Sequence, residues 1–312
     1  MTKRGRRRER EERGPSGFLV VDKPQNWTSH DVVDAARRWL GTRRVGHLGT
    51  LDPLATGVLP LAVRSATKLV SFVHDRGKSY TGTIRLGVET DTLDAEGRVL
   101  RTFDGRLPDE AEIRDALRHF LGDIEQIPPM FSAVKKGGVP LHKLAREGKE
   151  VEREPKAVRI DRLDLLKYES PYLELSVECS GGTYVRALAA DLGTRLGCGG
   201  HLAGLRRTRS GPFDLSLALT PELLEAERES GDVHRRLIPP LGMLGLPALR
   251  VGDEEIRLLQ RGNEIVATGP PHPPGSRIAA HDEDGQVVAI VEVRPGRRIR
   301  PVRVIRPFAG GR

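Results

Sequence analysis

Cysteine is scarce in this chain, and its scarcity excludes two kinds of site. The sequence holds two cysteines, Cys179 and Cys198, which form no CxxC and have no histidine at metal-ligand spacing. A structural zinc site or a disulfide framework needs more ligands or a different spacing. We therefore expect no metal, no disulfide framework and a reducing, cytoplasmic environment.

Long apolar runs are also lacking. No stretch approaches the roughly 18 apolar residues that a membrane-spanning helix requires, so we expect no membrane insertion. The N-terminus is charged but is not followed by an apolar core, which argues against a secretory signal. With 38% hydrophobic and 30% charged residues over 312 positions, the chain is long enough for one sizeable core and a smaller unit.

Nucleotide-binding fingerprints are missing as well. Gly77, Lys78 and Ser79 imitate the end of a phosphate-binding loop, but the position that must hold the first glycine of that motif is Phe72. No GxGxxG is present. We therefore expect neither a P-loop nor a dinucleotide cofactor.

Positive charge is concentrated at the two ends of the chain. Residues 1–14 hold seven basic and three acidic side chains, and residues 294–312 hold seven arginines and no acid, within a net charge of +8. Basic ends suit phosphate contacts that tether a polyanion without reading its sequence. The tail over 1–14, which we expect to be disordered, also fits a solvated segment that favours solubility.

The stretch 46–60, GHLGTLDPLATGVLP, is the strongest candidate for a reactive site. Its glycines allow tight turns, and Pro53 pushes the preceding Asp52 toward an extended conformation. The apolar run over 58–63 that follows reads as a buried strand, which would place one carboxylate at a strand mouth. A structural Asp-Pro turn explains the same residues, and spacing alone leaves both interpretations open.

Hydrophobic periodicity and capping residues predict an alternation of helices and strands. We expect strands over 18–21, 58–63, 78–86, 157–166 and 173–179, and helices over 28–41, 65–73, 108–122, from Thr183 and from Thr220. A Pro- and Gly-rich stretch over 238–247 indicates a domain boundary. Beyond it we expect a short helix over 253–262 and at least three strands, two of them joined by the turn at Asp284 and Gly285.

Three other features allow a functional and a structural interpretation. Tyr80 is typical of a half-buried strand aromatic. The segment 126–138, QIPPMFSAVKKGG, with Lys135 among its cations, fits a flap over RNA or a plain surface loop. Arg186 falls in the first turn of a helix, where it opposes the macrodipole, so a buried carboxylate partner would explain its position.

Four segments in the same order resemble one family. GHLGTLDPLATGVLP, KSYTG around Tyr80, QIPPMFSAVK, and GGTYVRALAADLG followed by LRRTRSGPF together resemble the bacterial tRNA pseudouridine synthases of the TruB type. The resemblance runs from about Gly17 to Pro212. It departs from the family at Leu48, where a small or polar residue is common, and at Phe131, where tyrosine is frequent.

The resemblance implies an α+β fold, in which helices flank a mixed, mostly antiparallel sheet. It implies a catalytic domain over 15–246 with a flap insertion at about 123–155, and a small β-rich, PUA-like RNA-binding domain over 247–312. The implied reaction converts uridine 55 in the T-arm loop of tRNA to pseudouridine, without a cofactor and with the protein as a monomer.

Site residues carried over from the resemblance fall on matching positions. Asp52 would be the nucleophile, Arg186 its charge partner, and Tyr80 a stacking face and possible base. The implied substrate-binding residues are His47, which would fill the gap left by the flipped base, Leu205, which would line the pocket, Lys23, Lys135, Arg206 and Arg207. Lys23 belongs to a motif whose role looks structural, and the arginines suit phosphate or pairing with acids.

Two alternatives belong to other classes. One is a non-catalytic protein that binds and remodels tRNA, and the other is a synthase directed by a guide RNA. A carboxylate facing RNA phosphates would serve no purpose in mere binding, which disfavours the first.

Overall fold

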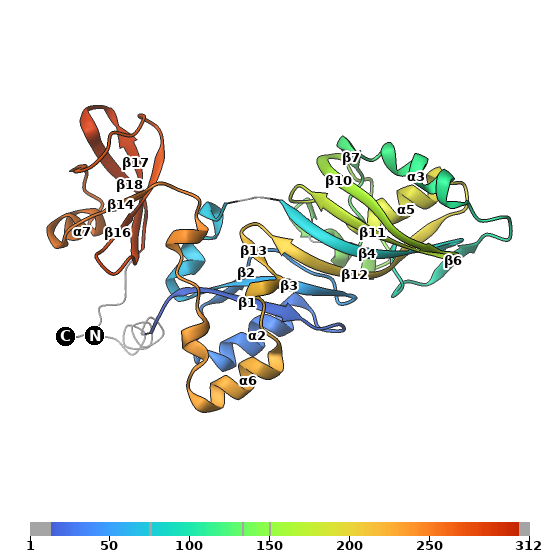
Figure 1. Ribbon diagram of the computed structural model, residues 1–312, viewed down its shortest axis with the longest axis horizontal. Helices are drawn as coiled ribbons and strands as arrows, with labels where there is room; N and C mark the ends of the chain where they lie inside the picture. Colours follow the sequence, from blue (N-terminus) through green and yellow to red (C-terminus); the bar gives the residue numbers. More distant parts are fainter. Residues whose placement is uncertain (1–13, 75–76, 133, 150, 306–312) are drawn as a thin grey trace.

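The computed structural model describes residues 14–74, 77–132, 134–149 and 151–305. The expected tail over 1–14 therefore lies outside the described residues except for Gly14, as do Arg306 and Arg312 of the C-terminal arginine cluster. Two sheets organise the described part of the chain (Figure 1).

A nine-stranded sheet forms the larger part of the molecule. Its strands run in the order β1-β3-β12-β4-β11-β10-β7, with β2 paired to β3 and β13 to β12. Neighbours are antiparallel apart from β12 and β3, which are parallel. The predicted mixed, mostly antiparallel sheet is confirmed. The strands are β1 (Gly17–Lys23), β2 (Val45–His47), β3 (Ala55–Val63), β4 (Lys78–Leu86), β7 (Gly122–Gln126), β10 (Lys156–Glu169), β11 (Tyr172–Cys179), β12 (Gly200–Ser210) and β13 (Phe213–Asp214).

Helices cover the sheet in two groups. α2 (Ser29–Trp39) and α6 (Pro221–Ser230) pack together beside β1, and α3 (Glu110–Arg118) and α5 (Val185–Arg195) pack together near β10 and β12 (Figure 1). α2 starts with a capping box, in which the side chains of Thr28 and Asp31 each accept from the other residue's backbone amide. Its apolar face, including Trp39, enters the main core, as the periodicity predicts.

The segment over 65–73 differs from its prediction. It forms two short 3-10 helices, η1 (Arg64–Lys68) and η2 (Val70–Phe72), instead of one α-helix. Arg64 opens the segment with φ of 52°, a left-handed conformation that an α-helix does not continue from. The preceding Val63 also gives the first turn no side-chain cap in the described structure.

Four strands of the large sheet are not predicted from the sequence, the short strands β2 and β13 and the longer strands β7 and β12. β12 is central, yet its sequence GHLAGLRRTRS lacks the alternation expected of a strand, because register shifts interrupt it after Leu202 and Arg207. β7 is a polar edge strand, GDIEQ, which the amphipathic pattern over 108–122 partly masks. The flap segment carries more structure than predicted, with β8 (Lys135–Lys136), β9 (Val139–Pro140) and α4 (Leu141–Arg146). A further two-stranded ribbon pairs β5 (Val88–Thr90) with β6 (Val99–Thr102).

The second sheet has five strands in the order β14-β16-β17-β18-β15 and its own apolar core with helix α7 (Asp253–Gln260). Its strands are β14 (Ala248–Arg250), β15 (Ile265–Val266), β16 (Arg277–His281), β17 (Val287–Arg294) and β18 (Arg298–Val304). The predicted turn between β16 and β17 holds Gly285 at φ of 75°. Short 3-10 turns make up the rest, η3 (Leu215–Leu217), η4 (Val233–Arg236), η5 (Leu241–Met243) and η6 (Pro295–Arg297). Among the described helices, none has the length and apolarity to cross a bilayer.

Candidate active site

The loop that carries Asp52 connects β2 to β3, and buried side chains that hydrogen-bond its backbone hold it in place. Ser29, at the start of α2, both accepts from the amide of Leu51 at 2.8 Å and donates to its carbonyl at 3.0 Å. Lys23, at the end of β1, is fully buried and donates to the carbonyls of Pro24, Trp27 and Pro53. Burial lowers the pKa of the Lys23 ammonium to about 8, and Asp52 opposes that shift. These bonds hold the backbone on both sides of Asp52.

Arg207 supports the same loop from β12. Its guanidinium is fully buried and donates to the carbonyl oxygens of Val58 at 2.7 Å, Thr50 at 3.3 Å and Gly49 at 3.2 Å. This differs from the expected substrate contact, because the planar donors of Arg207 are used by the protein itself. The side chain donates to two carbonyls of the loop and to one of β3, which is a structural role.

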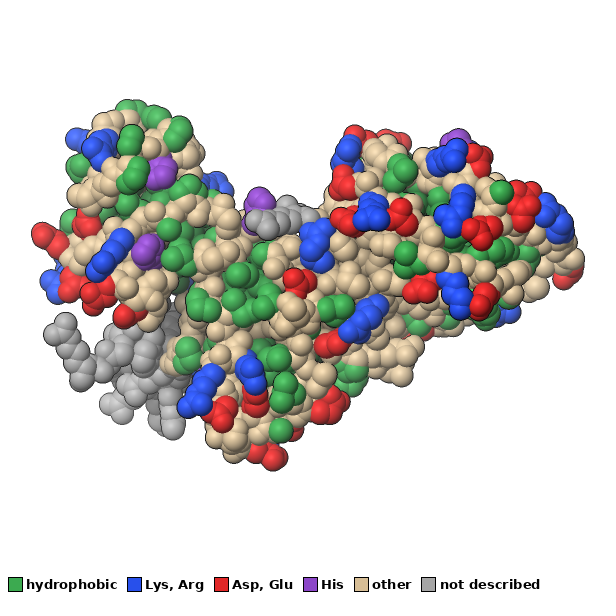
Figure 2. All heavy atoms as spheres, viewed as in Figure 1, with side chains coloured by type: hydrophobic (Ala, Val, Ile, Leu, Met, Phe, Trp, Pro, Cys, Tyr) green, Lys and Arg blue, Asp and Glu red, His purple; other side chains and the backbone are tan. Residues whose placement is uncertain are grey.

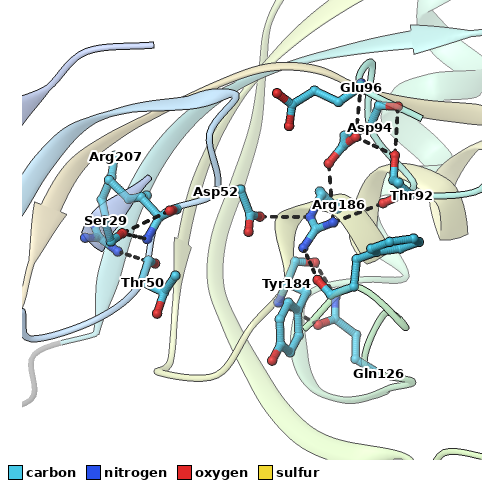
Figure 3. Close-up of polar contacts among 12 residues, drawn as sticks. Ser29, Thr50, Asp52, Thr92, Asp94, Glu96, Gln126, Tyr184, Arg186 and Arg207 are labelled. Carbon is cyan, nitrogen blue, oxygen red and sulfur yellow. Dashed lines mark hydrogen bonds and ion pairs between the residues drawn. The ribbon is translucent and has the colours of Figure 1, made fainter. Parts of the chain in front are cut away.

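Arg186 links Asp52 to a second acid. Its Nε lies 2.9 Å from Oδ2 of Asp52, and its Nη1 lies 3.3 Å from Oδ2 of Asp94 (Figure 3). Nη1 also donates to the carbonyl of Thr92 at 3.1 Å, and Nη2 to the carbonyl of Phe131 at 3.0 Å. The sequence predicts one carboxylate partner for this first-turn arginine, and the structure gives it two, Asp52 and Asp94. With its partners on all sides, the guanidinium has one orientation, in which Nε faces Asp52.

The two acids around Arg186 differ in exposure. The Asp52 side chain is 38% exposed and faces the pocket, whereas that of Asp94 is 4% exposed. Burial raises the pKa of the Asp52 carboxyl above its usual range and Asp94 adds to the effect, while the positive charge of Arg186 opposes it. Asp52 is thus a reachable carboxylate whose ionised form depends on its arginine partner.

Tyr80 and Leu205 bring neighbouring strands to the same pocket. Tyr80 lies on β4 and Leu205 on β12, and both line a cavity of about 220 Å³ together with Asp52 and Arg186. Burial raises the pKa of the Tyr80 phenol, which a hydrogen bond with Arg207 partly offsets. Phenolate is therefore scarce near neutral pH, and Tyr80 contributes chiefly a neutral aromatic surface.

The remaining predicted residues lie apart from this pocket. His47 is half-buried on β2, its Nδ1 has no hydrogen-bond partner among the described atoms, and burial lowers its pKa. Arg206 is partly exposed and pairs through Nη2 with Asp22 at 2.7 Å. Lys135 is exposed and is the first residue of β8, which pairs with β9 to form the flap hairpin. Their expected contacts with substrate stay predictions.

Three residues of the site escape sequence reading. Asp94 lies in a polar turn that looks solvated, and its burial depends on a bridge to Leu202 of the unpredicted strand β12. Lys78 lines the pocket, and Gln126 ends the unpredicted strand β7 and hydrogen-bonds the backbone of Tyr184. These two residues open the segments KSYTG and QIPPMFSAVK, but the segments do not show which of their side chains reach the site.

Metal ligation has no evident place in this site. Across residues 14–305, leaving aside the positions that the structure does not describe, no group of three or more His, Cys, Asp or Glu side chains is arranged to hold a metal ion. The pocket offers instead one carboxylate, one guanidinium, the ammonium of Lys78 and the aromatic side chains of Tyr80 and Tyr184. Those groups can supply a nucleophile, hold its charge and stack a planar ring.

Comparison with solved structures places the fold. A chain of a Cbf5-Nop10-Gar1 complex superposes with a TM-score of 0.70 at 26% identity, covering 94% of this chain and 85% of that one. A chain from an H/ACA RNP bound to a substrate RNA containing 2′-deoxyuridine superposes with a TM-score of 0.69 at 24% identity, covering 94% and 86%. The latter shares the fold.

Comparison of sequences goes further. A tRNA pseudouridine synthase B of Pseudomonas aeruginosa (strain UCBPP-PA14) is 44% identical over 298 residues, which cover 94% of this chain and 97% of that protein. One of Geobacter sulfurreducens is 43% identical, covering 90% and 94%. The model for the N-terminal domain of TruB family pseudouridylate synthases matches residues 37–185, and that for the tRNA pseudouridylate synthase B C-terminal domain matches residues 186–244. The chain therefore belongs to the TruB family of pseudouridylate synthases.

Proposed function

We propose that this protein converts uridine 55 in the T-arm loop of tRNA to pseudouridine, with Asp52 as the nucleophile. The observation that carries the proposal is the contact between Asp52 and Arg186 at the wall of a pocket that also holds Tyr80. The curated relatives at 43–44% identity are tRNA pseudouridine synthases, which supports tRNA as the substrate. The choice of uridine 55 rests on the resemblance of the four motifs.

The reaction breaks one bond and makes another without any redox change. The bond from C1′ to N1 of uridine breaks, the base turns, and C5 joins C1′. The proton lost from C5 is balanced by one gained at N1. Asp52 assists by transient covalent attack, either on C1′ of the sugar or on the uracil ring, and both routes need one ionised carboxylate.

Arg186 keeps that carboxylate available. Taking an acid out of water favours its neutral form, and this effect raises the pKa of Asp52. A charge-assisted contact at 2.9 Å restores the ionised form and fixes the direction of the attacking oxygen. The same contact explains why an arginine occupies the first turn of α5, where the helix dipole disfavours a cation.

The pocket suits a single base removed from its stack. Its volume of about 220 Å³ is below the roughly 300–1,000 Å³ of typical ligand pockets. Extruding a nucleotide costs a few kcal/mol, and stacking on an aromatic side chain returns about 1–3 kcal/mol. Tyr80 supplies that face from one side of the pocket and Leu205 adds apolar surface.

The RNA itself needs a larger surface than this pocket. On the face drawn in Figure 2, basic and acidic side chains are intermixed over the lobe that carries α3 and α5. Cations less closely matched by acids are offered by the flap, through Lys135, and by β18, through Arg298, Arg300 and Arg303, all exposed. We expect these residues to contact phosphates, which requires position and charge more than sequence.

A synthase directed by a guide RNA is the second candidate, because the structural neighbours include an H/ACA RNP. The higher identity to tRNA pseudouridine synthase B favours action without a guide. A non-catalytic tRNA-remodelling protein is a third possibility, which catalysis by the isolated chain would exclude.

The test uses purified full-length protein alone with tRNA and with a T-arm stem-loop, both labelled with tritium at C5 of uridine. Release of tritium measures turnover, and reverse-transcription stops after carbodiimide treatment locate the product. We expect release equivalent to one uridine per RNA, at position 55, and none from a stem-loop that carries cytidine there. Modification elsewhere would overturn the proposed position. No release at any protein concentration, with release restored by an added guide RNA, would favour the second candidate.

A further inference from the structure

Gln126 makes a buried connection between the flap and the helix that carries Arg186. It is the last residue of β7, at the root of the flap segment, and it is 2% exposed. Its Nε2 donates to the carbonyl of Tyr184 at 3.1 Å, and its Oε1 accepts from the amide of the same residue at 2.9 Å (Figure 3). The side chain of Gln126 thus binds both the backbone amide and the backbone carbonyl of Tyr184.

That residue is where α5 begins. Tyr184 is the N-cap of the helix, yet its own side chain caps no amide in the described structure. Thr183, which the sequence suggests as the cap, donates instead to the carbonyl of Ser180 at 3.0 Å. Orphan amides at a helix start need partners from elsewhere, and here Gln126 reaches across from β7 to the backbone of the N-cap.

The helix start is also where precise placement matters most. Arg186 lies two residues after Tyr184, and its Nε must face Asp52 for the ion pair to form. A cation in the first helical turn is repelled by the macrodipole, so the backbone there gains from an external restraint. Gln126 is suited to provide it because its two hydrogen bonds fix the rotation of the chain just before the arginine.

The flap also contacts the guanidinium of Arg186 directly. Five residues beyond Gln126, the carbonyl of Phe131 accepts from Nη2 of Arg186 at 3.0 Å. The segment that leaves β7 therefore holds the helix start through a side chain and the arginine head through a backbone oxygen. A change in the course of the flap would reach the ion pair by both contacts.

We propose that Gln126 is a positioning residue of this enzyme, which couples the root of the flap to the orientation of Arg186 toward Asp52. The proposal rests on the proposed role of Asp52 as the nucleophile. Gln126 acts through Tyr184 and Arg186 and does not line the pocket described above. Its loss should therefore slow the chemical step and leave the affinity for RNA nearly unchanged.

The test compares Gln126→Met with wild type in single-turnover kinetics across a pH series. Methionine keeps the length and the unbranched shape and removes both hydrogen bonds to Tyr184. We expect the rate to fall about tenfold to a hundredfold, as for a misplacement of catalytic groups by a fraction of an ångström to 1 Å, with RNA affinity within about twofold of wild type. The acidic limb of the rate profile should move to higher pH, because a looser Arg186 stabilises the ionised Asp52 less.

The matched control is Val158→Ala on β10, beside β7 in the sheet. Val158 is buried and pairs with Ile124, so its truncation weakens the same sheet edge and leaves the bonds to Tyr184 in place. Urea unfolding places the two variants on one stability scale. We expect the acidic limb of Val158→Ala to coincide with that of wild type. The proposal is overturned if Gln126→Met and Val158→Ala, at matched stability, show the same acidic limb and the same rate.

A second variant covers the case in which Gln126→Met does not fold. Gln126→Glu keeps the acceptor for the amide of Tyr184 and loses the donor once its carboxyl ionises, so at pH values above the pKa of that carboxyl its rate should fall below that of wild type. A rate equal to wild type would contradict the role of the donated bond. Asp52→Asn in the same assay separates the two proposals: if it is active, the nucleophile assignment fails, whereas an inactive Asp52→Asn beside a normal Gln126→Met overturns the positioning role alone.

Discussion

Nε of Arg186 lies 2.9 Å from Oδ2 of Asp52, although the two residues lie far apart in the sequence. Asp52 lies on the loop between β2 and β3, and Arg186 in the first turn of α5. Two features that look unrelated in the sequence explain each other here. The acid gains a charge partner against desolvation, and the arginine gains a reason to occupy an unfavourable helix end.

Asp52→Asn should abolish turnover and leave RNA binding largely intact. The amide keeps the size of the side chain and its contact with Arg186 but is no nucleophile, so we expect the rate to fall by at least about a thousandfold. Tritium release measures turnover, and filter binding measures affinity at fixed salt. Loss of both to the same extent would indicate that Asp52 is a structural acid of the loop.

Activity should show an acidic limb that belongs to Asp52. The reaction needs the ionised carboxylate, and burial raises its pKa, so kcat/KM should rise with pH through a value above the ordinary 3.9 of aspartate. Arg186→Met removes the main opposing charge and should move the limb to still higher pH while lowering the plateau. A series of kcat/KM measurements between pH 4 and 8 checks this.

The control for that series is Arg228→Met, which removes an exposed arginine paired with Glu225 on α6. The limb of this variant should coincide with that of wild type. If both variants move the limb equally, net charge is responsible and the specific contact with Asp52 is not.

Local chemistry predicts much of this fold because most elements carry their own start and stop signals. The cap at Thr28 and the alternation over 78–86 lead to α2 and β4 with bounds close to those observed. β12 shows what local chemistry cannot give. Its buried Arg207 is stable inside the sheet because two carbonyls of a distant loop and one of β3 accept hydrogen bonds from it, and that arrangement exists only after folding.

The residues of the candidate site likewise divide into those that the local sequence predicts and those that it does not. Asp52, Tyr80 and Arg186 carry motif signals, and their proximity in one pocket is a matter of geometry that the structure supplies. Asp94 carries none, since an acid in a turn is an ordinary surface pattern, and Gln126 opens the segment QIPPMFSAVK without a local sign of its bonds to Tyr184. Their importance appears when the topology brings β7, β12 and α5 together. Residues that position others are harder to predict than residues that react.

Arg207→Lys should destabilise the protein far more than Arg206→Lys, although the two arginines are neighbours. Lysine lacks the planar fork that reaches three carbonyls at once, so we expect a loss of about 2–5 kcal/mol in the free energy of unfolding. Arg206 holds a partly exposed pair with Asp22, and its replacement should cost less than about 1 kcal/mol. Urea unfolding of both variants checks the difference, which equal losses would contradict.

Gly57→Ala should be poorly tolerated, and Gly46→Ala in the same motif should be mild. Gly57 has φ of +97°, and a Cβ there would lie 2.2 Å from the carbonyl oxygen of Arg207. Strain and overlap together should cost about 3 kcal/mol or more. At Gly46 no described atom lies within 4 Å of an added Cβ, so we expect a change within about 1 kcal/mol. Thermal unfolding separates the two, and similar melting temperatures would refute the steric argument.

The role of the C-terminal arginines is better tested by substitution than by deletion, because deleting residues 294–312 would remove the strand β18. β18 places Ile299 in the core of the small sheet, fully buried, and Ile305 follows it at 2% exposure. Loss of affinity after such a deletion would reflect unfolding of the sheet as much as loss of charge. Replacing exposed arginines on the intact strand isolates the charge.

Changing Arg298, Arg300 and Arg303 together to serine should weaken tRNA binding at low salt and flatten its salt dependence. Each phosphate contact contributes about 0.7–0.9 to the slope of log K against log salt, so the slope should fall by about 2–3 units. The control triple variant, Arg106, Arg114 and Arg118 to serine, removes the same charge from exposed acid pairs around α3. The slope of log K against log salt for this control variant should stay near that of the wild-type protein. Equal slopes in all three proteins would mean that β18 does not contact RNA.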